Sequence, residues 1–379
     1  MKSKPRSSRV TLANVAARAG VSTTTVSLIL SGREEYIRQF HPDTVDKVRR
    51  SADRLGYRTN LFASGLPTKA SSFFAIILQE VGNREVSTWH HWGFEGDLLA
   101  GVIQEASENG VYPIVATAHP QADEAALRPM ETIIAGGVFG SIVRTPNPHL
   151  ERYLRLRMKQ GQPMVVVFPA KLAAWPTNAI DVDNVALGET AGRLLAAQGR
   201  RAWALVHFRR RGFEPLTRRT DGFRQAALEH GATIKDFVLP LGLDELRTRD
   251  LLAPRLRRAG VDGVFAVDSV ASVGALLACV KAGLVPGDDF HLVGCDCAFW
   301  QSSPLPNITS VDISWRDVGM AAIRKLCELS RAGESQFSTL LIRPRIVEGG
   351  TCPASPTVAG GTAIESPPVP DQMATMEKF

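Results

Sequence analysis

The chain has 379 residues, of which 44% are hydrophobic and 22% charged, a composition typical of a globular protein with two or three domains. Its apolar runs, such as residues 73–78, are too short to cross a bilayer, and no apolar stretch follows the basic amino terminus. The sequence therefore predicts neither a membrane span nor a signal peptide. Five cysteines, an odd number in a long chain, argue against a disulfide framework and for a reducing, cytoplasmic compartment.

Positive charge is concentrated in the first fifth of the chain. Residues 1–70 contain 13 Lys/Arg and 5 Asp/Glu, a net charge of +8, whereas the rest of the chain contains 31 and 33, a net charge of −2. A basic module on a near-neutral body is typical of proteins that bind nucleic acid. On charge alone, a basic solvated tail remains the alternative.

Apolar periodicity predicts three short helices in this basic segment. The first has an apolar stripe over residues 12–19, between a candidate N-cap at Thr11 and a terminating Gly20. The second begins at Ser22 as its N-cap, and the third covers residues 42–55. Because a tight glycine turn joins the first two, they form a helix-turn-helix unit, whose second helix lies in the major groove of DNA.

The second helix, STTTVSLIL, has two different faces. Its side toward the predicted core carries Val26, Ile29 and Leu30. Its opposite side, which would face the bases, carries Thr24, Ser27 and Leu28.

Three stretches, VTLANVAARAGVSTTTVSLILSG, DTVDKVRRSADRLGYRTN and LFASGL, resemble the DNA-binding headpiece of the lactose/galactose repressor family. The resemblance implies that Thr23 and Thr24 contact bases. It implies that small hydroxyls hold phosphates at Ser22, Thr25 and Ser27. It also implies DNA contacts from Thr11 and Tyr57.

Leu28 departs from the family, which commonly has an arginine there that binds a guanine. A leucine can pack on a thymine methyl group, or it can turn toward the third helix and contact no base; the sequence leaves both open. The segment from Arg33 to Pro42 is longer than the usual family turn. Either it brings Arg33 or Arg38 to an extra phosphate or it is a solvated loop.

A hinge is expected at residues 60–71, where NLFASGLP suits a helical turn or two with Asn60 as its N-cap. In the resembling family, paired hinge helices enter the minor groove, and a leucine wedges between bases. The resemblance assigns Asn60, Ala63 and Leu66 to this contact. A plain flexible linker would have the same sequence character.

From Phe73 onward, apolar strands alternate with amphipathic helices in about twelve units, which predicts parallel sheets covered on both faces. We expect a helix near 220–229, a last crossover helix near 315–330 and a final strand at 340–347. The pattern resembles the two-lobed, periplasmic-binding-protein-like core of the same family. The predicted fold is therefore α/β, with a three-helix headpiece (1–59), the hinge (60–71), the two-lobed core (72–352) and a disordered tail rich in Pro, Ala, Ser and Thr (353–379).

The family's effector site lies where strands end between the lobes. RRTDGFRQAAL resembles one of its elements and assigns Arg219, LVGCDC assigns Asp296, and DVDNVALG places Asp183 near the cleft. AVDSVASVGAL assigns Asp268, although Val267 replaces the family's usual Asn, which puts a polar contact there in doubt. An arginine guanidinium group and carboxylates can form charge-assisted hydrogen bonds with the hydroxyls of a sugar.

Two further residues follow strands of the first lobe. Phe94, in WHHWGF, could stack on a sugar or pack on a surface or dimer contact, and Arg144 ends the strand that begins GSIV. The two histidines of WHHWGF are weak evidence for a metal. Cys295 and Cys297 form a CxC pair that suits the end of a buried strand better than a metal site, because no second Cys/His pair is near in sequence.

The sequence contains no Walker A run, no dinucleotide glycine fingerprint, no HExxH and no GxSxG. We therefore predict no enzyme, no cofactor and no metal, but a homodimeric, cytoplasmic repressor of operator DNA whose effector is a sugar. A solute-binding protein for a sugar is the alternative, and the basic headpiece argues against it.

Overall fold

The computed structural model of the chain describes residues 10–30, 34–57, 72–79, 88–119, 122–135, 137–144, 148–169, 177–208, 214–297, 307–332 and 337–353. The chain divides into two compact units, one up to Ser72 and one from Phe73 onward. Each is described by itself below.

The amino-terminal unit is a small helical domain made of α1 (Leu12–Ala19), α2 (Thr23–Leu30), α3 (Glu34–Ile37) and α4 (Pro42–Leu55). Helix α1 begins with a capping box, in which Thr11 and Asn14 each satisfy the other's backbone N–H, and ends at Gly20, whose φ is +64°. The backbone N–H of Thr25 donates to Ser22 Oγ at 3.0 Å, so Ser22 caps α2 as predicted. These local signals place α1 and α2 around one tight turn.

Buried apolar side chains from three helices close this small core. Its fully or almost fully buried members are Val15, Ala16, Ala19, Val26, Ile29, Val45, Val48 and Ala52. The segment between α2 and α4, for which a solvated loop was one expectation, contains the one-turn helix α3, and Ile37 and Phe40 pack against the core. Arg33 lies outside the described residues, and Arg38 is exposed.

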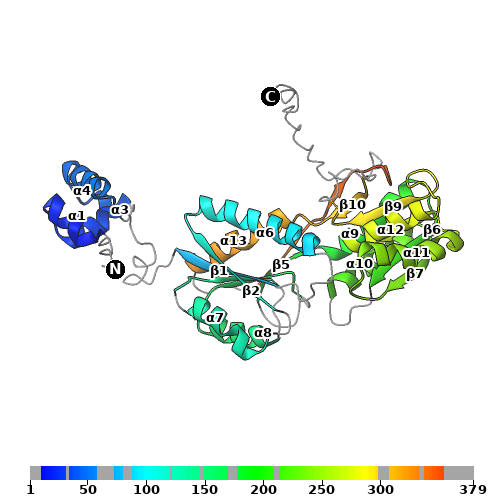
Figure 1. Cartoon of the computed structure of the whole chain (residues 1–379), viewed down its shortest axis with the longest axis horizontal. Coiled ribbons are helices and arrows are strands. Elements are labelled where there is room, and N and C mark those ends of the chain that lie inside the picture. The colour runs from blue at the N-terminus through cyan, green and yellow to red at the C-terminus, as the bar shows by residue number, and fades with distance from the viewer. Residues whose placement is uncertain are drawn as a thin grey trace, which may run out of the picture. The chain divides into compact units, whose positions relative to one another are not determined.

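The second unit contains two six-stranded sheets (Figure 1). The first has the order β11-β5-β4-β3-β1-β2 and is parallel throughout. Its strands are β1 (Phe73–Gln79), β2 (Tyr112–Ala118), β3 (Ser141–Arg144), β4 (Met164–Val167), β5 (Asn178–Val182) and β11 (Thr339–Ile342).

The second sheet has the order β12-β10-β9-β8-β6-β7 and is parallel except for the antiparallel pair β10–β12. Its strands are β6 (Ala202–Phe208), β7 (Thr233–Leu239), β8 (Gly263–Ala266), β9 (His291–Cys295), β10 (Thr309–Asp312) and β12 (Arg345–Val347). Parallel sheets of this kind need helices on both faces, and both sheets have them.

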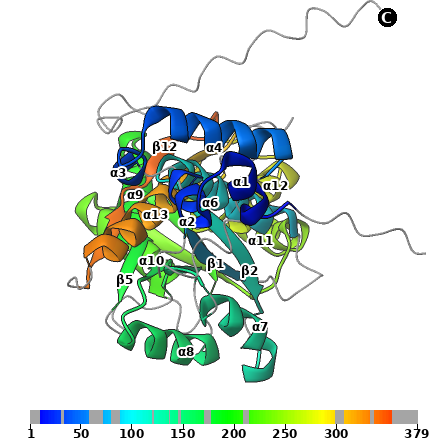
Figure 2. The same cartoon turned by 90° about the vertical axis from the view of Figure 1, so that its left-hand side faces the viewer.

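The first sheet lies between two helix pairs. Figures 1 and 2 show α6 (Thr88–Glu108) and α13 (Trp315–Ala332) on one face, with α7 (Glu124–Ala135) and α8 (Pro148–Lys159) on the other. Successive residues of a strand point to opposite faces. In β1, accordingly, Phe74 and Ile76 pack with the first pair and Ala75 and Ile77 with the second.

The second sheet is covered in the same way. Helices α9 (Asn184–Ala197) and α10 (Glu214–Glu229) contact each other and one side of the sheet, and α11 (Glu245–Ala259) and α12 (Ser269–Lys281) form the other contacting pair. The largest buried side chains here are Trp203, Phe223 and Phe265, whose rings lie in a row with centroids 5.2 and 4.9 Å apart.

The predicted fold class is confirmed, two local predictions were wrong, and one strand was missed. The expected final strand over 340–347 is two strands, β11 in the first sheet and β12 in the second, separated by Arg343 and Pro344. Strand β10, four residues long, was not predicted. Helix α10 begins at Glu214, six residues before the expected start, so it includes Arg219. None of the helices in the described ranges combines the length and the hydropathy of a membrane span.

Candidate DNA-binding surface and effector site

The outer face of α2 carries exposed hydroxyl groups. Thr23, Thr24 and Ser27 are exposed, whereas Val26 and Ile29 are buried in the domain core. The helix contains no charged residue, so these hydroxyls are the polar groups that it presents to solvent. Hydroxyl groups are neutral, and they can hydrogen-bond to base edges or to phosphate oxygens.

Three of the predicted DNA-binding residues also stabilise the domain. Thr11 caps α1, and Ser22 caps α2 while its hydroxyl lies 2.9 Å from the hydroxyl of Thr25. Tyr57 is half-buried against the domain core. Each hydroxyl can accept or donate a further bond, so a cap and a phosphate contact are compatible.

Leu28 is half-buried on α2, between exposed Ser27 and buried Ile29. A partly exposed leucine at the edge of this face fits both open interpretations, contact with a base or contact within the domain. The predicted hinge contacts at Asn60, Ala63 and Leu66 lie outside the described residues.

In the second unit, Arg219 is the most highly bonded of the predicted effector residues. It is 7% exposed; its Nε donates to Asn184 Oδ1 at 2.7 Å, and its Nη1 donates to the carbonyl of Val267 at 2.7 Å and to Cys295 Sγ at 3.2 Å. Burial alone would lower the pKa of Arg219, but Cys295, Asp296 and Asp268 raise it above its usual value, so the guanidinium stays charged. At position 267 the polar contact comes from the backbone carbonyl, because a valine side chain has no polar atom.

Asp296 lies directly after β9, beside Arg219. Its Oδ1 accepts a bond from the Ile313 N–H at 3.0 Å, and the residue is 7% exposed. Burial raises the pKa of Asp296 to about 7, with Arg219 opposing the rise and Asp312 adding to it. The backbone of Asp296 has a φ of +57°, a left-handed conformation that costs free energy in a residue other than glycine.

Asp183 and Asp268 are helix N-caps. Asp183 Oδ1 accepts from the Ala186 N–H at the start of α9 (3.0 Å), and Asp268 Oδ1 accepts from the Ala271 N–H at the start of α12 (2.8 Å). Burial raises the pKa of Asp268, against the effect of that hydrogen bond and of Arg219. Capping by itself accounts for an aspartate at both positions.

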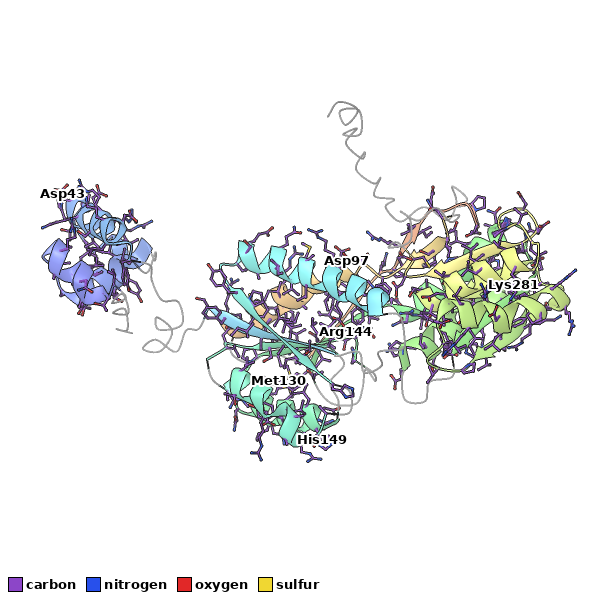
Figure 3. All side chains as sticks on the ribbon, in the orientation of Figure 1. Asp43, Asp97, Met130, Arg144, His149 and Lys281 are labelled. Carbon is purple, nitrogen blue, oxygen red and sulfur yellow. The ribbon has the colours of Figure 1, made fainter. Side chains whose placement is uncertain are left out.

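The remaining two predicted residues, Phe94 and Arg144, meet at Trp315. The Phe94 ring stacks on Trp315 with centroids 5.1 Å apart, and the Arg144 guanidinium lies over the Trp315 ring, 5.3 Å from its centroid. Arg144, which Figure 3 labels at the end of β3, also donates to the carboxylate of Glu95 on α6. Thus the predicted residues other than Asp183 form two groups, one around Arg219 and one around Trp315.

Trp315 connects these two groups and was not predicted. It is the first residue of α13, three residues after β10 ends, and it is close enough to the Asp296 carboxylate to favour its charged form. Phe168, which follows β4, packs on Trp315 with centroids 4.5 Å apart. The only feature of the sequence that could have identified Trp315 as a site residue is its place at the start of a crossover helix. Many aromatic residues at such places only pack in the core.

Glu95, Asp181 and Arg218 were also missed. Glu95 is 4% exposed and pairs with Arg144. Asp181 is fully buried in β5, and its Oδ2 lies 3.3 Å from Arg218 Nη2 on α10. Cys295 ends β9, and both Cys295 and Cys297 are buried, as predicted for this pair. Within the described ranges, no three His, Cys, Asp or Glu side chains come together as a metal site would require.

Comparisons with known proteins match both units. Residues 11–60 match the family model described as bacterial regulatory proteins, lacI family, and residues 171–352 match the periplasmic binding protein-like domain. Catabolite control protein A of Streptococcus mutans is 23% identical over 350 residues, which is 90% of this chain and 98% of that protein. The HTH-type transcriptional regulator AglR of Rhizobium meliloti is 28% identical over 296 residues, covering 76% of this chain and 78% of the relative.

Solved structures share the fold. The lac repressor dimer bound to operator and the anti-inducer ONPF has a TM-score of 0.74 at 19% identity, over 92% of this chain and all of the other. A complex of the transcriptional regulator CelR with cellobiose has a TM-score of 0.60 at 22% identity, over 90% of this chain and all of the other.

Proposed function

We propose that this chain, which belongs to the lacI family of bacterial regulatory proteins, binds operator DNA through α2 with an affinity that is controlled by a small molecule held between its two lobes. It is a DNA-binding transcription regulator and not an enzyme, since the relatives that match along most of its length are regulators of transcription. The observation that carries the proposal is the exposed hydroxyl face of α2 on a unit with a net charge of +8.

On DNA, Thr23, Thr24 and Leu28 contact base edges, and Ser22, Thr25 and Ser27 hold phosphates. Thr11 and Tyr57 contribute further backbone contacts. The excess of lysine and arginine in residues 1–70 supplies the sequence-independent part of the affinity. Residues 1–59 act as the reading domain and residues 60–71 as the hinge, in which Asn60, Ala63 and Leu66 meet the minor groove.

The effector is a sugar or sugar derivative that contacts Arg219 and Asp296 on one lobe and the Trp315 group on the other. Support comes from the CelR relative, whose solved complex contains cellobiose. Ligand binding favours one arrangement of the two lobes and so shifts the population between states with high and low operator affinity. The protein acts in the cytoplasm as a repressor that binds a pseudo-palindromic site as a homodimer.

A truncated chain that begins at Ser72 tests the division of labour. We expect it to bind no operator and to keep the thermal shift that an effector produces in the full chain. The full chain should lose operator affinity steeply between about 50 and 200 mM salt, as lysine and arginine release counterions from the phosphates. Operator binding by the truncated chain, measured by fluorescence anisotropy, would contradict the assignment of the headpiece.

A further inference from the structure

Five side chains from separate elements form one contiguous group, which we call the inter-lobe cluster: Glu95, Arg144, Phe168, Asp296 and Trp315. Arg144 bonds to Glu95 and lies over the Trp315 ring, Phe168 packs on that ring, and Asp296 is close to the indole. Glu95, Phe168, Asp296 and Trp315 are each less than 10% exposed. The cluster therefore has a low local dielectric, in which an uncompensated charge is costly.

The cations in and beside this cluster have anionic partners. Arg144 is paired with the Glu95 carboxylate, and Arg219 is surrounded by Asp296 and Asp268. Together with Asp268 beside Arg219, Glu95 and Asp296 place three carboxyl groups in and next to the cluster. A phosphate or carboxylate placed here would lie beside carboxyl groups while both guanidinium groups are already paired, so its buried charge would lack compensation.

One buried carboxylate oxygen of the cluster, on Glu95, has no hydrogen-bond partner among the described residues. This atom is Oε2; the other carboxylate oxygen, Oε1, accepts from Arg144. A buried carboxylate oxygen without a donor is destabilising unless a water or a ligand supplies one. A sugar hydroxyl can donate a hydrogen bond to Glu95 Oε2, whereas an anionic oxygen without a proton cannot.

Backbone strain is found at the same place. Among the described residues, the non-glycine residues with positive φ are Phe168 (+52°) and Asp296 (+57°), and both are members of the cluster. They follow β4 of the first sheet and β9 of the second, so each lobe presents one strained residue beside Trp315. Such conformations persist where the surroundings impose them, and they are common at ligand-binding positions.

We infer that the effector is a neutral polyhydroxyl compound, a saccharide without phosphate or carboxylate, and that Glu95 is the residue that imposes this choice. A hydroxyl of the sugar donates to Glu95 Oε2, while Glu95 neutralises Arg144 and thereby removes the cation that an acidic sugar would need. The inference rests on the proposed function, since it concerns the effector of the same regulator.

The test uses matched sets of probes on the full chain. Each neutral sugar (glucose, galactose, ribose, cellobiose, maltose) is compared with its phosphorylated or acidic counterpart by thermal shift, followed by calorimetry for those that bind. The tightest ligand is expected to be neutral, and its anionic counterpart at least about tenfold weaker, the equivalent of one unsatisfied or repelled polar group.

Glu95→Gln should weaken the neutral ligand by about tenfold and improve binding of the anionic counterpart, because Arg144 is left without its anion. The double variant Glu95→Gln/Arg144→Gln removes both charges of the pair. It leaves no uncompensated buried charge that could unfold the chain, so it shows whether misfolding explains the effect of Glu95→Gln. The preference for the neutral ligand should fall in the order parent, double variant, Glu95→Gln. Glu105→Gln is the matched control, since Glu105 is also a buried carboxylate of α6 paired with an arginine, Arg324, but lies outside the cluster.

Three results would overturn the inference: an anionic sugar that binds more tightly than every neutral one, equal ligand profiles for Glu95→Gln and Glu105→Gln, or a panel in which no neutral sugar binds. Operator binding is measured on the same samples. If it persists while the charge preference fails, only the inference about Glu95 is wrong. If operator binding itself is absent, the proposed function fails.

Discussion

Asp181 is a carboxylate that the fold holds away from water. Burial raises its pKa to about 6, although the Val182 N–H and the guanidinium of Arg218 favour the charged form. An unfolded Asp has a pKa near 3.9, so the folded chain binds this proton more tightly. The contribution to stability is therefore complete below about pH 4 and is lost as the pH rises through about 6.

We predict that the free energy of unfolding of the parent protein falls by roughly 2–3 kcal/mol between pH 4 and 8 because of Asp181. Asp181→Asn should remove that part of the pH dependence and raise the stability at pH 8. Denaturant unfolding at several pH values measures it. Asp236→Asn should act with the opposite sign, because Arg224 and His207 hold the pKa of Asp236 below its usual value despite partial burial. Identical pH profiles for the parent and Asp181→Asn would contradict the buried charge.

Leu28 gives a second prediction at the scale of one side chain. If it packs on a thymine methyl, Leu28→Ala should relax the preference at one base pair in each half-site, at a cost of about 1 kcal/mol or less. Leu28→Arg should move the preference toward guanine, because arginine donates twice to that base. Selection from a randomised DNA pool reads both effects. An unchanged motif in both variants would mean that Leu28 contacts the domain and not a base.

In each lobe two helices cross at glycines: α6 and α13 in the first lobe, and α9 and α10 in the second. A Cβ at Gly188 would lie 2.0 Å from the carbonyl oxygen of Arg219, and one at Gly222 would lie 2.1 Å from that of Val185. In the first lobe, Gly101 and Gly319 make the same close approach, at 2.0 and 2.3 Å. Each lobe thus uses the absence of a side chain to bring two helix backbones together, although the sequences of the two pairs differ.

Gly188→Ala should therefore lower the free energy of unfolding by about 1–3 kcal/mol, since a methyl group forces the helices apart. It should also weaken effector binding, because the displaced carbonyl belongs to Arg219. Gly96→Ala, in the exposed part of α6 with open space around it, is the control and should be neutral or stabilising by up to about 1 kcal/mol. Equal stability of the two variants, from urea unfolding, would refute the role of the close crossing.

At the scale of the whole molecule, exposed apolar side chains on α11 and α12 are suited to a subunit contact. Leu246, Leu251 and Val280 are 55%, 43% and 53% exposed. Between them Asp250 forms ion pairs with both Lys281 and Arg249, so α11 and α12 are also linked by charge. Exposed apolar side chains can bury their surface in a contact with a second copy of the chain.

We expect the double variant Leu251→Asp/Val280→Asp to be monomeric in sedimentation velocity and to bind operator far more weakly, because two linked headpieces no longer reach one site together. Leu228→Asp, on α10, changes a leucine that is 78% exposed and should leave both properties unaltered. A variant that sediments like the parent would place the subunit contact on another surface.

The sequence by itself determined what depends on neighbours a few residues apart. Thr11, Ser22 and Gly20 set the ends of α1 and α2 through bonds within one helical turn, and apolar periodicity marked most strands and helices of both sheets. The same local motifs pointed to Arg219 and Asp296. Their side chains lie together because Asp296 follows a strand of the second sheet and Arg219 reaches the ends of strands in that sheet. In a parallel sheet the carboxyl ends of the strands meet at one edge, so the order of strands and helices along the chain is enough to predict this.

Only the tertiary structure decided which distant residues meet. Glu95 and Arg144 are 49 positions apart, and Trp315 joins them to Asp296 from the start of a helix that packs on the first sheet. The last strand is divided because residues on the two sides of Arg343 pair with different sheets. Such contacts depend on the packing of whole elements against one another, and propensity and periodicity carry no information about that packing.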